Sequence, residues 1–146
     1  EILSGLRAVA APFKQNELLK SKVAAMGVLY LTDGDTLLHG DYFPGSWLQT
    51  NQGIRIIDPE FCFFGLPEFE IGVTIAHLMM ADQPYILIEQ AIAQYNSRVS
   101  IDDELRAKFT ATEILRRILG LAQLPLTIDL EKRKALLEYA QQTLIS

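Results

Sequence analysis

The fold of this chain is decided by residues 38–72, which read LHGDYFPGSWLQTNQGIRIIDPEFCFFGLPEFEIG. Within this stretch, WLQT and IRII are two short runs with the composition of β-strands, and the three residues between them end in Gly53. A three-residue connection that ends in a left-handed glycine is typical of a β-hairpin. The hairpin would return the chain so that Asp58, at the end of the second strand, lies beside Ser46, at the start of the first.

Three acidic side chains are expected to meet at this end of the hairpin. Asp58 and Glu60 are two residues apart, so an extended backbone would point both carboxylates to the same side. Asp41 lies on the glycine-rich loop that leads into the first strand. Close carboxylates raise each other's pKa unless a cation lies among them, and two carboxylates with substrate phosphates are the usual ligands of Mg²⁺. The pattern indicates a phosphoryl-transfer centre in which Asp41 orients an attacking hydroxyl.

Four motifs carry a resemblance to a known group of enzymes. The chain resembles the aminoglycoside phosphotransferase and choline kinase superfamily, which are small-molecule kinases with a protein-kinase-like fold, and within it the methylthioribose kinase branch. The resemblance is strong over residues 38–81 and faint elsewhere. The motifs that carry it are His39-Gly40-Asp41, Gly45-Ser46-x-Leu48, Asp58-Pro59-Glu60-Phe61 and Phe69-Glu70-Ile71-Gly72.

The resemblance implies a role for each acidic residue. Asp41 corresponds to the catalytic aspartate, and Asp58 and Glu60 correspond to residues that hold the metal. Ser46 stands where most of the superfamily has a metal-binding asparagine, and the methylthioribose kinase branch resembles this chain in having serine there. The implied activity is ATP-dependent and Mg²⁺-dependent phosphorylation of a hydroxyl on a small, sugar-like metabolite such as methylthioribose.

The chain departs from the family pattern at two places, and the Tyr42-Phe43 departure, together with Ser46, leaves a first alternative open. Tyr42 and Phe43 replace the usual Leu-His pair after the aspartate, and Glu70 replaces an aspartate, which would adjust how the loop is braced. One alternative is a catalytically silent, kinase-like binding module. A second alternative is a metal-dependent phosphoesterase, since clustered carboxylates also suit a two-metal site. The two histidines, which are not at metal-ligand spacing, count against it.

The remaining sequence predicts a fold of mixed α and β structure that is mostly helical, as in the C-terminal lobe of a protein-kinase-like fold with a small hairpin at its active site. Apolar residues recur at helical spacing near residues 2–13, 19–30, 67–81, 88–95, 101–119 and 130–144, with Pro12 expected to end the first helix early. The helix expected at residues 67–81 is apolar on nearly all sides. Its polar residues form one narrow stripe, expected to face the catalytic loop: Glu70, Thr74 and His77.

Composition sets the class of protein. The 146 residues carry a net charge of −5 and are 49% hydrophobic, which predicts a single domain, 1–146, and argues against a nucleic-acid-binding surface. No apolar run reaches the ~18 residues of a membrane span, so a cytoplasmic location is the default expectation. Cys62 is the only cysteine and is expected to be buried, and Arg116 and Arg117 are expected on a solvated helix face.

The sequence lacks the parts that bind a nucleotide. It contains neither G-x-G-x-x-G nor G-x-x-x-x-G-K-[ST], and no lysine lies in a convincing strand. The kinase template needs a lobe with such a lysine to cover the phosphates of ATP. We therefore expect an N-terminal nucleotide-binding lobe of the same protein to precede residue 1, with this chain as the lobe that carries the catalytic and acceptor-binding residues.

Overall fold

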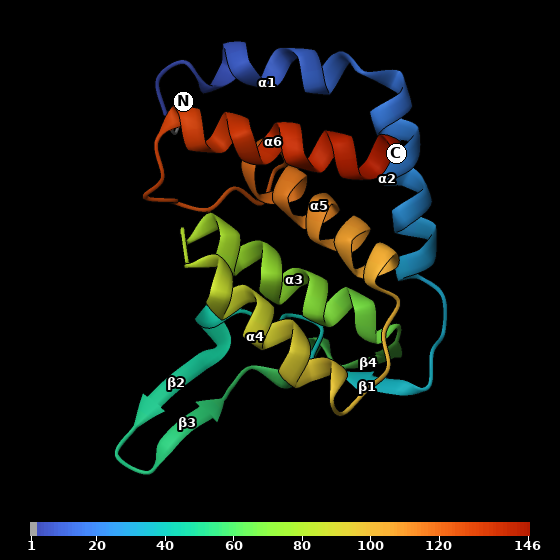
Figure 1. Cartoon of the computed structure of the whole chain (residues 1–146), viewed down its shortest axis with the longest axis vertical. Helices are drawn as coiled ribbons and strands as arrows, with labels where there is room; N and C mark the ends of the chain where they lie inside the picture. Colours follow the sequence, from blue (N-terminus) through green and yellow to red (C-terminus); the bar gives the residue numbers. More distant parts are fainter. Residues whose placement is uncertain (1–2) are drawn as a thin grey trace.

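The computed structural model describes residues 3–146, and these residues form six α-helices and four short strands (Figure 1). The fold is therefore mixed and mostly helical, as the sequence predicts. In chain order the elements are α1 (Leu6–Gln15), α2 (Glu17–Tyr30), β1 (Thr36–Leu38), β2 (Trp47–Thr50), β3 (Gly53–Ile56), β4 (Phe63–Gly65), α3 (Pro67–Met80), α4 (Tyr85–Asn96), α5 (Asp103–Leu119) and α6 (Leu130–Ile145).

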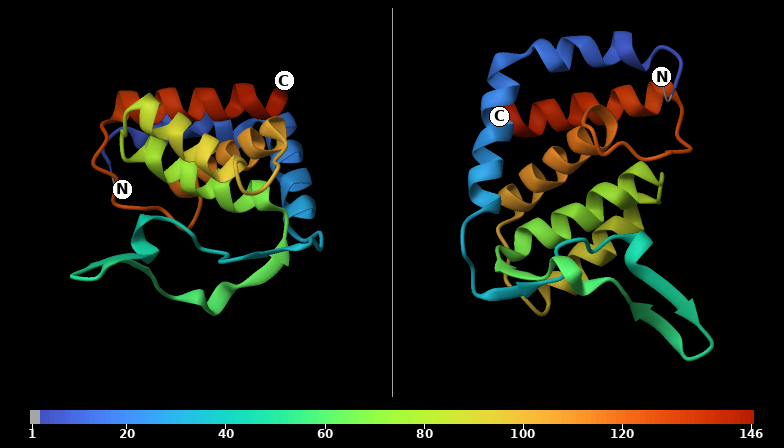
Figure 2. Two further views of the ribbon diagram at one scale, coloured as in Figure 1. Left: turned by 60° about the horizontal axis from the view of Figure 1, so that its bottom comes forward. Right: turned by 180° about the vertical axis from the view of Figure 1, so that it is seen from behind.

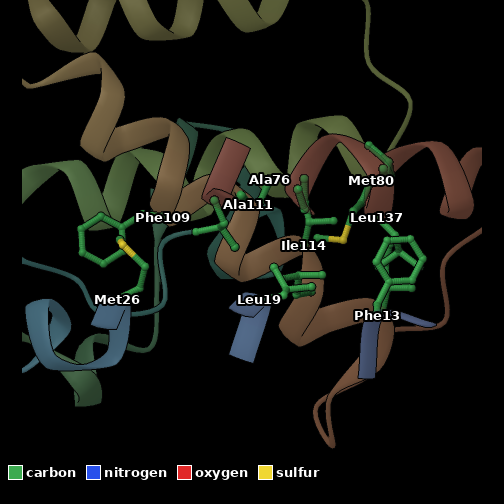
Figure 3. Packing of buried hydrophobic residues seen from close by; sticks show 14 of the residues in the cluster. Phe13, Leu19, Met26, Ala76, Met80, Phe109, Ala111, Ile114 and Leu137 are labelled. Carbon is green, nitrogen blue, oxygen red and sulfur yellow. The ribbon is translucent and has the colours of Figure 1, made fainter. Parts of the chain in front are cut away.

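Helix α3 is buried between other helices because it is apolar on almost every side. It packs against α5 on one side and α4 on the other, and α5 in turn packs against α6 (Figure 1). Helices α1 and α2 complete the main core, whose side chains interdigitate in Figure 3. The labelled core residues are Phe13, Leu19, Met26, Ala76, Met80, Phe109, Ala111, Ile114 and Leu137. This core fixes α3 and α5, the two helices that support the candidate site.

A glycine sets how closely α3 and α5 approach. A Cβ atom added to Gly72 would lie 2.8 Å from Cβ of Phe109 and 3.0 Å from the carbonyl oxygen of Arg106. The hydroxyl of Thr110 donates a hydrogen bond to the Gly72 carbonyl oxygen, at 3.1 Å. Close helix contact of this kind requires a residue without a side chain, because any Cβ atom would overlap the facing helix.

The predicted hairpin is present and projects away from the helices (Figure 2). Strands β2 and β3 pair antiparallel from Trp47 opposite Ile56 to Thr50 opposite Gly53, which leaves a two-residue turn rather than the expected three. Gly53 has a φ of 105°, in the left-handed region where glycine is favoured. A second small antiparallel pair, β1 with β4, was not predicted from the sequence.

Two local predictions are wrong. Helix α1 continues through Pro12 to Gln15, because Leu6, Ala10 and Phe13 are buried in the main core while Pro12 lies on the exposed side. The apolar packing therefore outweighs the roughly 3 kcal/mol that an internal proline costs. Cys62 is exposed rather than buried.

No helix among the described residues combines the length and the apolar character that crossing a membrane requires.

Candidate active site

The loop that carries Asp41 is held by the polar stripe of α3, as predicted. One carboxylate oxygen of Glu70 accepts hydrogen bonds from the backbone N–H groups of His39, at 2.6 Å, and Gly40, at 3.0 Å. The hydroxyl of Thr74 donates to the carbonyl oxygen of Tyr42, at 2.9 Å. Burial raises the pKa of Glu70, and the two N–H groups oppose that rise. Glu70, the residue that replaces the family's aspartate, therefore braces the loop directly.

The same loop is tied to the turn that carries Asp58 and Glu60. Nε2 of His39 lies 2.8 Å from the carbonyl oxygen of Ile57, the residue before Asp58. Gly40 has a φ of 84°, and a Cβ atom added to it would lie 2.2 Å from the carbonyl oxygen of Phe61. The two backbones therefore touch at a position where only glycine fits. His39 therefore acts as a structural brace between the two segments.

Ser46 is buried beneath this junction, with 3% of its surface exposed. Its hydroxyl donates a hydrogen bond to the carbonyl oxygen of Asp41, at 2.7 Å, and its own carbonyl oxygen accepts one from the N–H of Ile57, at 3.0 Å. The hairpin thus returns the chain to Ser46, as expected. The hydroxyl proton is committed to the loop, so only the oxygen lone pairs remain available to a metal ion.

The backbone at Asp58 differs from the expected extended form. Asp58 has φ 59° and ψ 54°, and Pro59–Phe61 form a turn of 3₁₀ helix. Aspartate tolerates the left-handed conformation, and Pro59 favours the first position of a helical turn, so the sequence DPEF bends here. The prediction that extended geometry aligns the two carboxylates is therefore wrong.

Asp58 and Glu60 are both exposed at this turn. Among residues 3–146, no three His, Cys, Asp or Glu side chains are grouped closely enough to hold one metal ion. The assignment of Asp58, Glu60 and Ser46 as metal ligands stays a prediction from the sequence. The donor set fits a hard cation that takes its other ligands from substrate phosphates, since two carboxylates are the usual protein share of such a site.

A pocket of about 560 Å³ opens beside Asp41, which lies on its wall. The pocket lies between the loop of Asp41 and helices α2, α3 and α5. Its lining combines apolar side chains with two arginines, a composition suited to a small molecule that has both polar and apolar parts. The lining residues are Val23, Met26, Gly27, Tyr30, Gly40, Asp41, Phe61, Phe69, Val73, Phe109, Thr112, Glu113, Arg116 and Arg117.

A charged network forms part of the pocket wall and is centred on Glu113, which is 4% exposed. The Glu113 carboxylate accepts hydrogen bonds from Nε of Arg116 at 2.6 Å, from Nε of Arg117 at 2.7 Å and from Nε2 of His77 at 3.1 Å. Burial alone would raise the pKa of Glu113, but these hydrogen bonds outweigh burial and lower it to about 2. Nη2 of Arg117 lies 3.6 Å from Oδ1 of Asp41.

This network was not predicted from the sequence, because Arg116 and Arg117 were expected on a solvated helix face. That prediction is wrong for Arg117, whose side chain is 11% exposed. A signal was present in the spacing of Phe109, Glu113 and Arg117, since residues four apart share one face of a helix. A carboxylate and a guanidinium in line with a core phenylalanine indicate a buried ion pair.

Comparison with known proteins identifies the family. The pattern of the phosphotransferase enzyme family (APH) matches residues 5–109. The methylthioribose kinase of Exiguobacterium sibiricum is 41% identical over 83 residues, which are 57% of this chain and 21% of that protein. The methylthioribose kinase of Bacillus velezensis is 37% identical over 75 residues, 51% of this chain and 19% of that protein.

A plant protein shows the same likeness. Methylthioribose kinase 1 of Oryza sativa subsp. japonica is 33% identical over 72 residues, 49% of this chain and 17% of that protein. In each case the match spans only about a fifth of the relative's length. The family pattern, in contrast, covers most of this chain, from α1 into α5. This chain belongs to the phosphotransferase enzyme family.

Proposed function

We propose that the protein is an ATP-dependent kinase that phosphorylates a hydroxyl group of a small metabolite, with Asp41 as the catalytic base. The observation that carries the proposal is the position of Asp41. Its loop is braced by Glu70 and Thr74, packs against the turn of Asp58 and Glu60, and forms part of the wall of the pocket. A base that is fixed at the edge of an acceptor pocket, on a loop that packs against the turn of two carboxylates, matches the kinase template.

The pocket beside Asp41 is the proposed acceptor site. A hydroxyl of the acceptor would donate its hydrogen bond to the Asp41 carboxylate, which takes the proton as the new phosphorus–oxygen bond forms and the bond between the γ-phosphorus of ATP and ADP breaks. Nη2 of Arg117 lies 3.6 Å from Oδ1 of Asp41, too far for a direct hydrogen bond. The carboxylate therefore keeps its lone pairs for the incoming hydroxyl.

Asp58 and Glu60 are the proposed ligands of Mg²⁺, with Ser46 as a further candidate through its remaining lone pairs. The metal, when bound with ATP, neutralises charge on the transferring phosphate. The two carboxylates lie on the turn against which the Asp41 loop packs through Gly40. Contacts to the nucleotide would come from an N-terminal lobe of the same protein, outside residues 1–146, which form the catalytic and acceptor-binding lobe.

The proposed acceptor is a sugar-like metabolite of the methylthioribose kind. Two lines of support are independent of each other. Relatives with which this chain shares 37–41% identity over about half its length are named methylthioribose kinases. The pocket pairs guanidinium groups, which suit sugar hydroxyls, with apolar side chains such as Met26 and Val73, which suit a thioether tail. We expect the protein to act in the cytoplasm.

The test is a panel of acceptors assayed with the intact protein, ATP and Mg²⁺, with ADP release and phosphorylated product measured together. Methylthioribose, choline, homoserine and an aminoglycoside form the panel. We expect ADP release that depends on the acceptor and is fastest with methylthioribose. A protein that binds Mg²⁺-ATP but transfers phosphate to none of them, or one that releases free phosphate from an ester without a nucleotide, would contradict the proposal.

A further inference from the structure

Glu113 lies at the centre of a network that joins three elements of the site. It is on α5, His77 is on α3, and Phe43 is on the catalytic loop. The His77 and Phe43 rings pack with their centroids 4.6 Å apart, and Cζ of Arg117 lies 5.6 Å from the centroid of Phe43. The catalytic loop therefore contacts the ion network through Phe43 as well as through Asp41.

Glu113 leaves Arg117 little freedom. The Nε–H of Arg117 is bonded to Glu113, and one face of its guanidinium lies against Phe43 at a cation–π distance. The terminal Nη2 group then points to Asp41, at 3.6 Å from Oδ1. Without Glu113, an arginine at this position would be free to form a bidentate pair with Asp41, which would occupy the lone pairs that the reaction needs.

The balance of charges around Glu113 also indicates that this residue restrains the arginines. Two guanidinium groups, of Arg116 and Arg117, face two carboxylates, of Glu113 and Asp41. Buried ion pairs contribute no more to stability than well-packed apolar residues. Helices α3 and α5 already share an apolar core that includes Ile114 and Ile118, both fully buried. Stability therefore does not explain why a charged residue occupies position 113, and its position indicates a role at the pocket.

We propose, on the basis of the proposed kinase function, that Glu113 is a positioning residue that holds Arg117 beside Asp41 and holds Arg116 at the pocket. Glu113 does not touch the reacting atoms. It acts through the arginines, which fix the orientation of the Asp41 carboxylate and of the acceptor. A shift of about 1 Å in such groups can cost about 100-fold in rate.

The kinetic test is a double-mutant cycle in the intact protein with Glu113→Gln and Arg117→Lys. Glutamine has the shape of glutamate but only one acceptor oxygen, and its amide nitrogen is a donor, so the Nε–H of at least one arginine loses its acceptor. We expect Glu113→Gln to lower kcat/KM for the acceptor by about 10- to 100-fold while KM for ATP is unchanged. Added to Arg117→Lys, the same substitution should cost less than about 3-fold.

The matched control is Glu104→Gln on the same helix. It removes an exposed carboxylate that pairs with Lys108. It should leave both kinetic constants unchanged. If Glu113→Gln folds and retains wild-type kcat/KM, or if its cost is the same with and without Arg117→Lys, Glu113 does not position Arg117 for the reaction and the proposal is overturned.

A second measurement tests whether Glu113 holds the arginines, independently of the proposed function. In the intact protein labelled with ¹⁵N-arginine, the Nε–H groups of Arg116 and Arg117 should give slowly exchanging NMR signals, because both are bonded to a buried carboxylate. Glu113→Gln should remove at least one of them, and Glu104→Gln should keep both. If the wild-type protein phosphorylates no acceptor, the proposed function fails, and these signals alone decide whether Glu113 holds the arginines. Signals that are absent in the wild type, or unchanged in Glu113→Gln, overturn the positioning proposal.

Discussion

Nε2 of His39 lies 2.8 Å from the carbonyl oxygen of Ile57, and this contact joins the two halves of the candidate site. His39 is two residues before Asp41, and Ile57 is the residue before Asp58. With the packing of Gly40 against Phe61, the contact keeps the loop of the proposed base against the turn of the proposed metal ligands. The relative position of these groups is therefore set by the His39 ring and by a backbone contact, neither of which depends on the rotamers of the acidic side chains.

Glu70 should be important for stability because it satisfies two backbone N–H groups of the catalytic loop. Glu70→Ala leaves both N–H groups without a partner, at a cost of about 1–3 kcal/mol each. The free energy of unfolding, measured by urea denaturation, should fall accordingly. Glu104→Ala, at an exposed position, serves as the control and should change it by less than about 0.5 kcal/mol. Equal stability of the two variants would contradict the bracing role.

Two glycines should respond in opposite directions to alanine. Gly72→Ala brings a Cβ atom within 2.8 Å of Cβ of Phe109, and overpacking of this kind costs about 1–3 kcal/mol. Gly27, on α2, has no atom within 4 Å of its added Cβ, so Gly27→Ala should stabilise the helix by about 0.5–1 kcal/mol. Thermal or urea unfolding of both variants measures this. A Gly72→Ala protein as stable as Gly27→Ala would mean that α3 and α5 are not in close contact.

Glu113 should make the free energy of unfolding depend on pH between about 2 and 4.5. Its pKa is about 2 in the folded protein against 4.5 for an ordinary glutamate, so the unfolded state binds more protons between these values. The stabilisation, roughly 3 kcal/mol, is fully present above pH 4.5 and is lost as the pH falls towards 2. The difference in unfolding free energy between the wild type and Glu113→Gln should shrink over this range. A difference that is independent of pH would contradict the depressed pKa.

We also expect these 146 residues, expressed alone, to fold but to bind ATP only weakly. Charge-assisted hydrogen bonds contribute about 1.5–3 kcal/mol each, so without the proposed nucleotide-covering lobe a micromolar site would become millimolar or weaker. Isothermal titration with Mg²⁺-ATP measures this, and the intact protein is the control. Robust ATP turnover by residues 1–146 alone would show that the proposed location of the nucleotide is wrong.

Much of the structure of residues 38–72 could be predicted from the sequence, because the main contacts of these residues are local or involve the helix that follows. The hairpin, the return of the chain to Ser46, and the bracing of the loop by Glu70 all connect neighbouring segments. The left-handed conformation of Asp58 was not predicted, because the β-strand composition of the residues just before it favours a backbone that stays extended. The sequence DPEF permits the bend, and the packing of the turn against Gly40 fixes it.

Contacts between distant segments account for the other features that the sequence did not reveal. Strands β1 and β4 have three residues each, too few for an alternating pattern, and they pair across a long intervening segment. Arg117 meets Asp41 only because α3 and α5 pack closely at Gly72 and bring α5 under the catalytic loop. Charge alone favours a solvated arginine, and only the tertiary contact buries it.

The most direct test of the account is the turnover of Asp41→Asn in the intact protein, with the acceptor that the panel identifies. Asparagine keeps the size of the side chain but cannot take the hydroxyl proton, and positioned base catalysis contributes about 10²- to 10⁴-fold. The account predicts that kcat falls by that factor while the protein stays folded, and that Asp33→Asn, in the exposed loop after α2, has no effect. Wild-type kcat in Asp41→Asn would contradict the assignment of Asp41 as the catalytic base and with it the proposed site.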